Sequence, residues 1–200
     1  MVNPRKYLDQ LFISKVRIKA IRDFFMNPDK PIHLRGAVRE LDEEINAVRR
    51  ELERMEQIKF VTSERKGNRK YFTLNPDFVF FAELQGIVFK SFGIGAEIIT
   101  NQNKLGHIDF AVLTQRYVHG REFGAHDVDL VVIGDVDLKL LDQIVGHFED
   151  KQGRDIHYTV LSRPDFEVRR RHRDNFVMEL LLQQRLMLIG DGVELVGRGN

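Results

Sequence analysis

Two aspartates one residue apart, Asp127 and Asp129, are the best candidates in this sequence for binding a metal ion. Both lie in the run 127–133, which predicts a β-strand, and side chains two residues apart on a strand point to the same face. Two carboxylates at a strand end, beside His126, can ligate a divalent cation through oxygen. The competing interpretation is a pair of solvated or capping acids, and the pair alone does not separate the two.

A second candidate site lies on one helix nearer the N terminus. Its apolar residues fall within about 80° of arc at roughly 100° per residue, which predicts one buried stripe. They are Ile45, Val48, Leu52 and Met55. The opposite face carries Asn46, Arg50, Arg54 and Gln57, with Arg49 on its flank. Because Asn and Arg pair bidentately with adenine and guanine edges, this face is suited to the major groove of DNA.

Two β-rich runs, 58–63 and 69–74, follow this helix and flank a Gly67-Asn68 turn, which predicts a β-hairpin. Polar and cationic residues at the tip are suited to contact the phosphate backbone beside the groove. They are Arg65, Lys66, Asn68, Arg69 and Lys70. A solvated hairpin tip is the alternative. Glu43 and Glu53 oppose phosphate binding unless they face the preceding helix or disfavour wrong sequences.

Two earlier helices would position the third. Ser14 can cap a helix that Asn27-Pro28 ends, since proline lacks an amide donor. A short helix is predicted from Leu34 to Leu41. The acidic run 42–44 then predicts a cap and an acidic first turn for the third helix.

Charge is distributed unequally between the two parts of the chain. Residues 1–75 hold 17 Lys and Arg against 11 Asp and Glu, whereas residues 76–200 hold 14 against 19. A basic module joined to an acidic one indicates that only the first meets a polyanion. The chain has no Cys and no apolar run of the roughly 18 residues that span a membrane, so we expect a cytoplasmic protein without a membrane partner.

Residues 10–76 resemble the winged helix-turn-helix regulators of bacteria and archaea. The resemblance is strongest in the run 48–55 and in the hairpin strand 68–72. It implies a sequence-specific regulator of transcription that binds double-stranded DNA. Palindromic operators are read by two-fold dimers, so a homodimer is expected. The apolar helix predicted in the linker, 77–100, packs either in such a dimer or within its own chain.

The remainder, 101–200, predicts strands interleaved with helices. The expected strands are 108–113, 127–133, 155–161 and 186–189, and the expected helical regions are 137–150 and 164–184. The fold class is therefore α+β: a winged helix domain at 1–76, then a linker helix, then a small α/β domain with a mixed sheet.

Residues 95–190 resemble the minimal nucleotidyltransferases of the DNA polymerase beta-like superfamily. The matching features are Gly120, Asp127-Val128-Asp129 and the run 130–134. The resemblance implies that Asp127 and Asp129 hold Mg²⁺ or Mn²⁺ with a nucleotide.

Two departures from the family pattern oppose activity. Gln115-Arg116 replaces the Gly-Ser turn that would receive the nucleotide phosphates, although Arg116 could still hold a phosphate. His157 stands where the resemblance places a third, catalytic carboxylate, and Asp155 is a displaced substitute. We therefore expect a domain without transferase activity that dimerises or senses a ligand such as a nucleotide. The alternatives are an active transferase that adenylylates a protein or small molecule, and a surface for a partner protein. The basic run 169–173 is a solvated helix face or a second phosphate contact.

Overall fold

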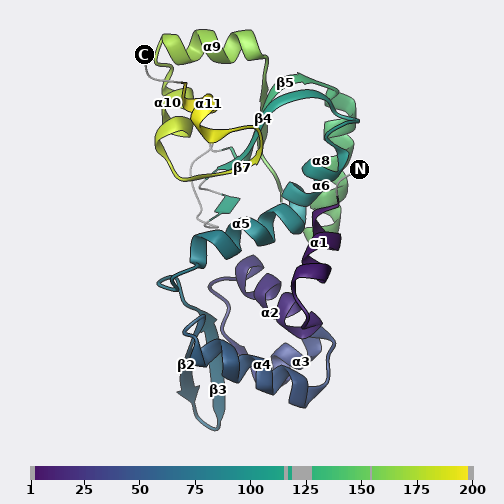
Figure 1. Cartoon of the computed structure of the whole chain (residues 1–200), viewed down its shortest axis with the longest axis vertical. Helices are drawn as coiled ribbons and strands as arrows, with labels where there is room; N and C mark the ends of the chain where they lie inside the picture. Colours follow the sequence, from purple (N-terminus) through teal and green to yellow (C-terminus); the bar gives the residue numbers. More distant parts are fainter. Residues whose placement is uncertain (1–2, 115–116, 119–127, 154, 198–200) are drawn as a thin grey trace. The chain divides into compact units, whose positions relative to one another are not determined.

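The computed structural model describes residues 3–114, 117–118, 128–153 and 155–197 and is a mixed α and β structure. The chain divides into two compact units, Pro4–Phe92 and Gly93–Asn200. The N-terminal unit contains five helices and a small antiparallel sheet among these residues (Figure 1). Its elements are α1 Pro4–Leu11, α2 Lys15–Met26, β1 Ile32–His33, α3 Leu34–Leu41, α4 Ile45–Gln57, β2 Val61–Lys66, β3 Arg69–Leu74 and α5 Phe81–Ser91.

The first predicted helices form with the expected ends. Ser14 caps α2 by accepting a hydrogen bond from the Arg17 amide at 3.2 Å, and Asn27 ends that helix. The bounds of α3, Leu34–Leu41, are those that the sequence predicts.

The start of α4 confirms the predicted cap but not the predicted acidic first turn. Glu44 is the N-cap, and its carboxylate accepts the amides of Asn46 and Ala47; these two bonds lower the pKa of Glu44. Asp42 instead ends α3 in a left-handed conformation, and α4 has no acidic residue in its first turn. The predicted stripe is also wrong at one end, since Ile45 is exposed and Glu51 is buried in its place.

The end of α4 explains why β2 begins three residues later than predicted. The amides of Lys59 and Phe60 donate to the carbonyls of Glu56 and Met55, at 3.0 and 2.9 Å. This is a Schellman closure, and it holds Lys59 at φ 62°. Residues 58–60 are therefore used to end the helix and cannot join the strand.

We expect Lys59→Gly to stabilise the N-terminal unit by about 1 kcal/mol, because glycine adopts the left-handed conformation without the strain of a Cβ atom. Urea unfolding followed by circular dichroism measures this. Arg50→Gly, at an exposed position in the middle of helix α4, is the matched control and should destabilise the unit by a similar amount. A lower midpoint for Lys59→Gly would contradict the assignment of the closure.

The sheet has the order β1-β3-β2, with both pairs antiparallel. Lys66 pairs with Arg69 across the predicted two-residue turn. Gly67 is at φ 59°, as the first central residue of a type II′ turn requires. The predicted hairpin therefore forms with its expected turn.

Phe60 lies at the centre of the N-terminal core and is 1% exposed. Its ring packs edge-on against Phe24, Phe25 and Phe78, with centroids 6.0, 5.8 and 5.5 Å away. These contacts join α2 to the residues that follow α4 and β3, so Phe60 helps to fix the direction in which α4 leaves the core.

The predicted linker helix forms as two helices. The first, α5, contacts α1 and α2 within the N-terminal unit, and Phe81 packs against Phe25 at 5.2 Å between centroids. Its apolar face is thus partly covered by its own chain. The second, α6 Gly93–Asn101, belongs to the C-terminal unit.

The C-terminal unit is built on a mixed four-stranded sheet in the order β6-β5-β4-β7 (Figure 1). The pairs β4–β5 and β4–β7 are antiparallel, and β5–β6 is parallel. Its elements after α6 are β4 Gly106–Thr114, β5 Leu130–Val136, α8 Leu138–Gln152, β6 Tyr158–Leu161, α9 Arg163–Arg171, α10 Asn175–Leu182, β7 Arg185–Ile189 and α11 Gly192–Val196.

Residues 130–134 of β5 are all buried, as their unbroken apolar run predicts. One core of this unit joins β4, β5 and α9, with Phe110 and Phe166 both at its centre. The helical region 164–184 is divided, because Asp174 caps a separate helix, α10, and Arg173 takes φ 53°. No helix within the described residues is long and apolar enough to cross a membrane.

Candidate functional site

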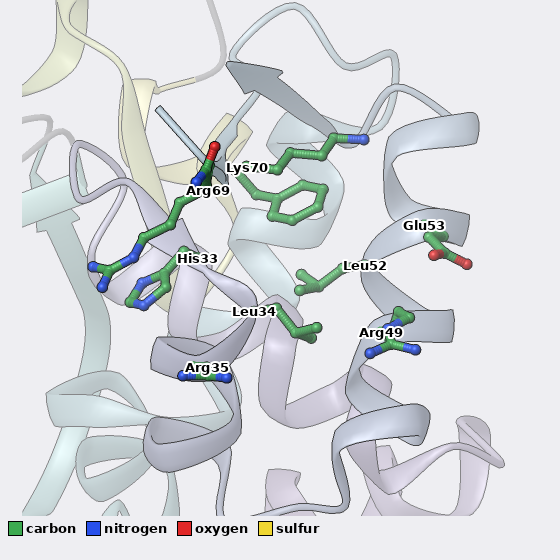
Figure 2. Close-up of a pocket in the computed structure, with 10 residues that line it drawn as sticks. His33, Leu34, Arg35, Arg49, Leu52, Glu53, Arg69 and Lys70 are labelled. Atoms are coloured by element: carbon green, nitrogen blue, oxygen red, sulfur yellow. The ribbon is translucent and has the colours of Figure 1, made fainter. Parts of the chain in front are cut away.

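A groove of about 490 Å³ lies in the N-terminal unit between α3, α4 and the β2–β3 hairpin. Figure 2 shows His33 and Arg69 together on one side, Arg49 and Glu53 on α4 opposite them, and Leu34 and Leu52 between. The groove has an apolar floor and a largely cationic rim. The rim cations are Arg35, Arg49, Arg69 and Lys70, and Glu53 is the carboxylate among the lining residues.

The side chains of five exposed arginines on and around this groove form no hydrogen bond or ion pair within the described residues. They are Arg35 of α3, Arg49 and Arg50 of α4, Arg65 of β2 and Arg69 of β3. We call these five residues the arginine surface. Unneutralised guanidinium groups at this density create a positive potential that attracts a polyanion.

The hairpin is fixed to α4 through one carboxylate. Glu56 accepts hydrogen bonds from Lys70 Nζ and Ser63 Oγ, each at 2.5 Å. Lys70 also lies 5.2 Å above the Phe72 ring. The ammonium group of Lys70, a predicted phosphate contact, is therefore partly neutralised by Glu56. This bond also sets the spacing between the hairpin and α4.

These bonds make the hairpin anchor dependent on pH. The hydrogen bonds from Lys70 and Ser63 lower the pKa of Glu56 below its ordinary 4.5. Stability from this carboxylate is therefore fully present above pH of about 4.5 and is lost as the pH falls through the lower, folded pKa. We expect the unfolding midpoint of Glu56→Gln to change less between pH 6 and 3 than that of the parent chain. Equal pH profiles would contradict this role.

The other predicted residues of α4 divide into two groups. Asn46, Arg49, Arg50 and Gln57 are exposed. Arg54 is also exposed, but it lies 3.7 Å from the buried carboxylate of Glu51 in an ion pair, so part of its charge is neutralised within the protein. Lys66 of the hairpin pairs with Glu64 at 3.2 Å, with both side chains mostly exposed. Asn68 is exposed and lines the groove.

The two carboxylates that would oppose phosphate binding, Glu43 and Glu53, lie in different surroundings. Glu43 pairs with Lys19 of α2 at 2.6 Å, so it contacts the first predicted helix and not α3, the helix that directly precedes α4. Glu53 lines the groove. Only Glu53 therefore places a negative charge among the rim cations.

His33 and Arg35 line the groove but are missing from the sequence-based site. They come from β1 and the first turn of α3, where His33 stacks on Tyr71 with centroids 5.4 Å apart. Strand β1 has two residues, too few to show an alternating pattern, so its pairing with β3 cannot be predicted from periodicity. The available signal was Arg35 itself, an exposed cation in the first turn of the helix before α4.

In the C-terminal unit, Asp129 and His157 are neighbours across the parallel strands. The Asp129 carboxylate is 1% exposed; its Oδ2 accepts the His157 amide at 3.0 Å and lies 3.7 Å from His157 Nδ1. The Asp129 amide donates to the His157 carbonyl at 2.6 Å. This carboxylate thus joins the residues that precede β5 and β6.

The described residues include only part of the predicted metal and nucleotide site. Gln115, Arg116, Gly120 and Asp127 lie outside the described residues. Asp155 is exposed and lies before β6, which begins at Tyr158. The predicted strand 155–161 is therefore wrong in its first three residues, and Asp155 does not lie on a strand beside His157. Among the residues that the structure describes, no cluster of three or more His, Asp or Glu could hold a metal ion.

The basic run of α9 is largely engaged within its own unit. Arg170 pairs with Glu167 at 2.5 Å and donates to the Leu195 carbonyl at 3.2 Å. Arg169 lies 3.8 Å from Asp174, and Arg171 donates to the Glu167 carbonyl at 3.4 Å. These cations differ in this respect from the arginine surface.

Comparison with known proteins gives no family for this chain. No family model matches it, and no curated protein sequence does. A solved structure that it matches is human N-acetylserotonin methyltransferase in complex with SAM, at 9% identity and a TM-score of 0.30. The match covers 61% of this chain and 37% of that one, and a similarity this low carries no argument about function.

Proposed function

We propose that the N-terminal unit is a winged helix-turn-helix that binds double-stranded DNA, and that the protein regulates transcription. The observation that carries the proposal is the arginine surface. Its five guanidinium groups project from α3, α4 and the hairpin, and none of them forms a direct ion pair with a carboxylate in the described part of the chain. Arg50 interacts with Glu44 at longer range. Charges left unpaired around one groove favour a phosphate-rich partner.

The division of labour follows from the elements. Helix α4 presents Asn46 and Arg50 on its exposed face, and side chains of these types read base edges in the major groove. The hairpin beside it presents Arg65 and Arg69, which suit the sugar–phosphate backbone. The backbone of one strand would then follow the groove between α4 and the hairpin.

Two substitutions separate base reading from backbone binding. Arg50→Ala should relax sequence preference, because it removes a base contact, and cost about 1–3 kcal/mol on the preferred site alone. Lys66→Ala should weaken all duplexes evenly, and by less, because its ammonium already pairs with Glu64. Selection from a random duplex pool, followed by fluorescence anisotropy on selected and scrambled duplexes, measures both. Even losses from Arg50→Ala would contradict base reading by α4.

We further propose that the C-terminal unit is a nucleotidyltransferase-like scaffold without transferase activity, which dimerises or senses a ligand. Support comes from Asp129, whose buried carboxylate accepts the His157 backbone amide through Oδ2. A carboxylate that ties two segments together inside the protein is poorly placed to bind a solvated metal ion.

An active transferase is the second candidate, favoured by the parallel pairing that sets Asp129 beside His157. Incubation with labelled ATP, Mn²⁺ and cell extract tests it. Transfer of label that Asp129→Asn abolishes would establish activity, provided that the variant unfolds at the parental midpoint. We expect no transfer.

A further inference from the structure

A second cavity lies on the other flank of α4 from the groove. It measures about 360 Å³ and we call it the rear cavity. The groove is lined from α4 by Arg49, Leu52 and Glu53. The rear cavity is lined from the same helix by Glu51, Arg54, Met55 and Gln57, and by Ile58 at its C-cap. Its remaining lining residues are Phe12, Arg17, Ile21, Phe60 and Leu84. Any occupant would therefore contact α4 directly.

The walls of the rear cavity are apolar, and one end is charged. At that end Glu51, with a side chain 5% exposed, accepts from Arg17 Nε at 2.5 Å and lies 3.7 Å from Arg54 Nη1. Ser14 Oγ also donates to Glu51, at 3.4 Å. Two guanidinium groups around one carboxylate leave a net positive charge beside an apolar volume.

The two guanidinium groups at this end have N–H donors that remain available to a ligand. Arg17 uses its Nε on Glu51, and its terminal nitrogens form no hydrogen bond to any residue that the structure describes. Arg54 is 61% exposed and can turn towards solvent or towards the cavity. At the rim Ile58 is 61% exposed, a large apolar side chain left in water beside the opening. Such a combination suits a ligand with an apolar body and one negative head group.

We propose that the rear cavity binds a small amphipathic carboxylate, whose apolar body contacts Leu84 and Ile58 and whose head group pairs with Arg17 and Arg54. The cavity volume lies within the range of small-molecule sites, about 300–1,000 Å³. A ligand head group that engages Arg54 removes this cation from the exposed side of α4. Ligand and DNA therefore compete for Arg54, an effect that rests on the proposed function and is reciprocal by linkage.

Three probes with the same body test the head group: 3-phenylpropanoate, 3-phenylpropanamide and 3-phenylpropylamine, each titrated into the full chain by calorimetry without DNA. We expect the carboxylate to bind with a Kd of roughly 10 µM to 1 mM, as its size allows, and the amide about tenfold more weakly. The amine should not bind. Equal binding of carboxylate and amide, or no binding of the carboxylate, overturns the proposal.

Variants on α4 locate the site. Arg54→Gln should weaken carboxylate binding about tenfold, and Ile58→Glu, at an exposed rim position, should abolish it by charge repulsion. Arg50→Gln is the matched control, because Arg50 lies on the same helix outside the rear cavity lining, and it should leave the carboxylate affinity unchanged. An unchanged affinity in Arg54→Gln, or a parallel loss in Arg50→Gln, contradicts the assignment.

The coupling has its own readout. Saturating 3-phenylpropanoate should lower the log–log salt slope of DNA binding by about one, the contribution of one phosphate contact, and Arg54→Gln should remove this effect. Carboxylate binding without any DNA binding would support the rear cavity as a ligand site and contradict the proposed DNA-binding function. DNA binding without carboxylate binding would support the DNA-binding function and contradict the rear cavity as a ligand site.

Discussion

Replacing Arg49 and Arg69 with glutamine should lower the affinity of the protein for duplex DNA by roughly 100-fold at low salt, since each lost charge-assisted contact costs at least tenfold. The two residues face each other across the groove, one on α4 and one on β3 (Figure 2). Neither has an internal partner in the described part of the chain, so glutamine removes charge without leaving a buried group unsatisfied. The log–log salt slope should become less steep by about 1.8.

The control for this double variant removes two positive charges elsewhere. Lys15 of α2 and Arg173 of the C-terminal unit are both exposed and do not line the groove. Lys15→Gln/Arg173→Gln should reduce affinity less than threefold, by the general loss of charge alone (about 0.5 kcal/mol). A loss as large as that of Arg49→Gln/Arg69→Gln would mean that affinity follows net charge and not the groove.

Phe60→Ala should destabilise the N-terminal unit by about 3–5 kcal/mol, because it opens a cavity among three other phenylalanine rings. The same change should abolish DNA binding at temperatures where the unit is then unfolded. Urea unfolding of the full chain, followed by far-ultraviolet circular dichroism, should show an early transition that the parent lacks.

Phe166→Ala is the matched substitution in the other unit. Phe166 is fully buried against Phe110, with centroids 6.4 Å apart, and its truncation should cost a similar amount. We expect Phe166→Ala to unfold the C-terminal unit early and to leave DNA binding by monomers intact. A loss of DNA binding equal to that of Phe60→Ala would show that the two units do not unfold separately.

The elements of the N-terminal unit that could be predicted are those with strong local signals. Ser14 and Asn27 delimit α2, the stripe of Val48, Leu52 and Met55 defines α4, and Gly67 fixes the hairpin turn. Each signal depends on neighbours in sequence. The exchange of Ile45 for Glu51 in the buried face could not be predicted, because Glu51 is bonded there to Ser14 and Arg17, which lie 37 and 34 residues away.

The candidate site was predictable to a similar extent. Arg49, Arg50, Arg65 and Arg69 follow from their positions on a helix and a hairpin, and the structure adds that they lack ion pairs among the described residues. The anchoring of Lys70 by Glu56 and the place of Arg35 beside the groove depend on how α3, α4 and β3 pack. Side-chain partners across elements are set by tertiary structure, and one sequence does not reveal them.

In the C-terminal unit, too, local features could be predicted from the sequence but side-chain contacts could not. The buried strand β5 follows from its apolar run, and the neighbouring positions of Asp129 and His157 follow from the parallel pairing of β5 with β6. That Asp129 turns inward onto the His157 amide could not be inferred from an Asp-x-Asp pattern. An Asp and a His at these positions can bind a metal ion, or the Asp can accept a backbone amide and join two segments. Which of these occurs depends on the direction in which the carboxylate points.

The salt dependence of duplex binding tests the central proposal most directly. Fluorescence anisotropy of the full chain with a labelled duplex, from about 50 to 300 mM KCl, should give a log–log slope of about −4 to −5, because each phosphate contact contributes about −0.9 and five arginines are expected to contact phosphate. These are Arg35, Arg49, Arg65 and Arg69 of the arginine surface, together with Arg54. Single Arg→Gln changes at these five positions should each reduce the slope by about one, whereas Arg50→Gln, which removes a base contact, should leave it nearly unchanged. A slope near zero, or no binding at the lowest salt concentration, would show that these five arginines do not meet DNA.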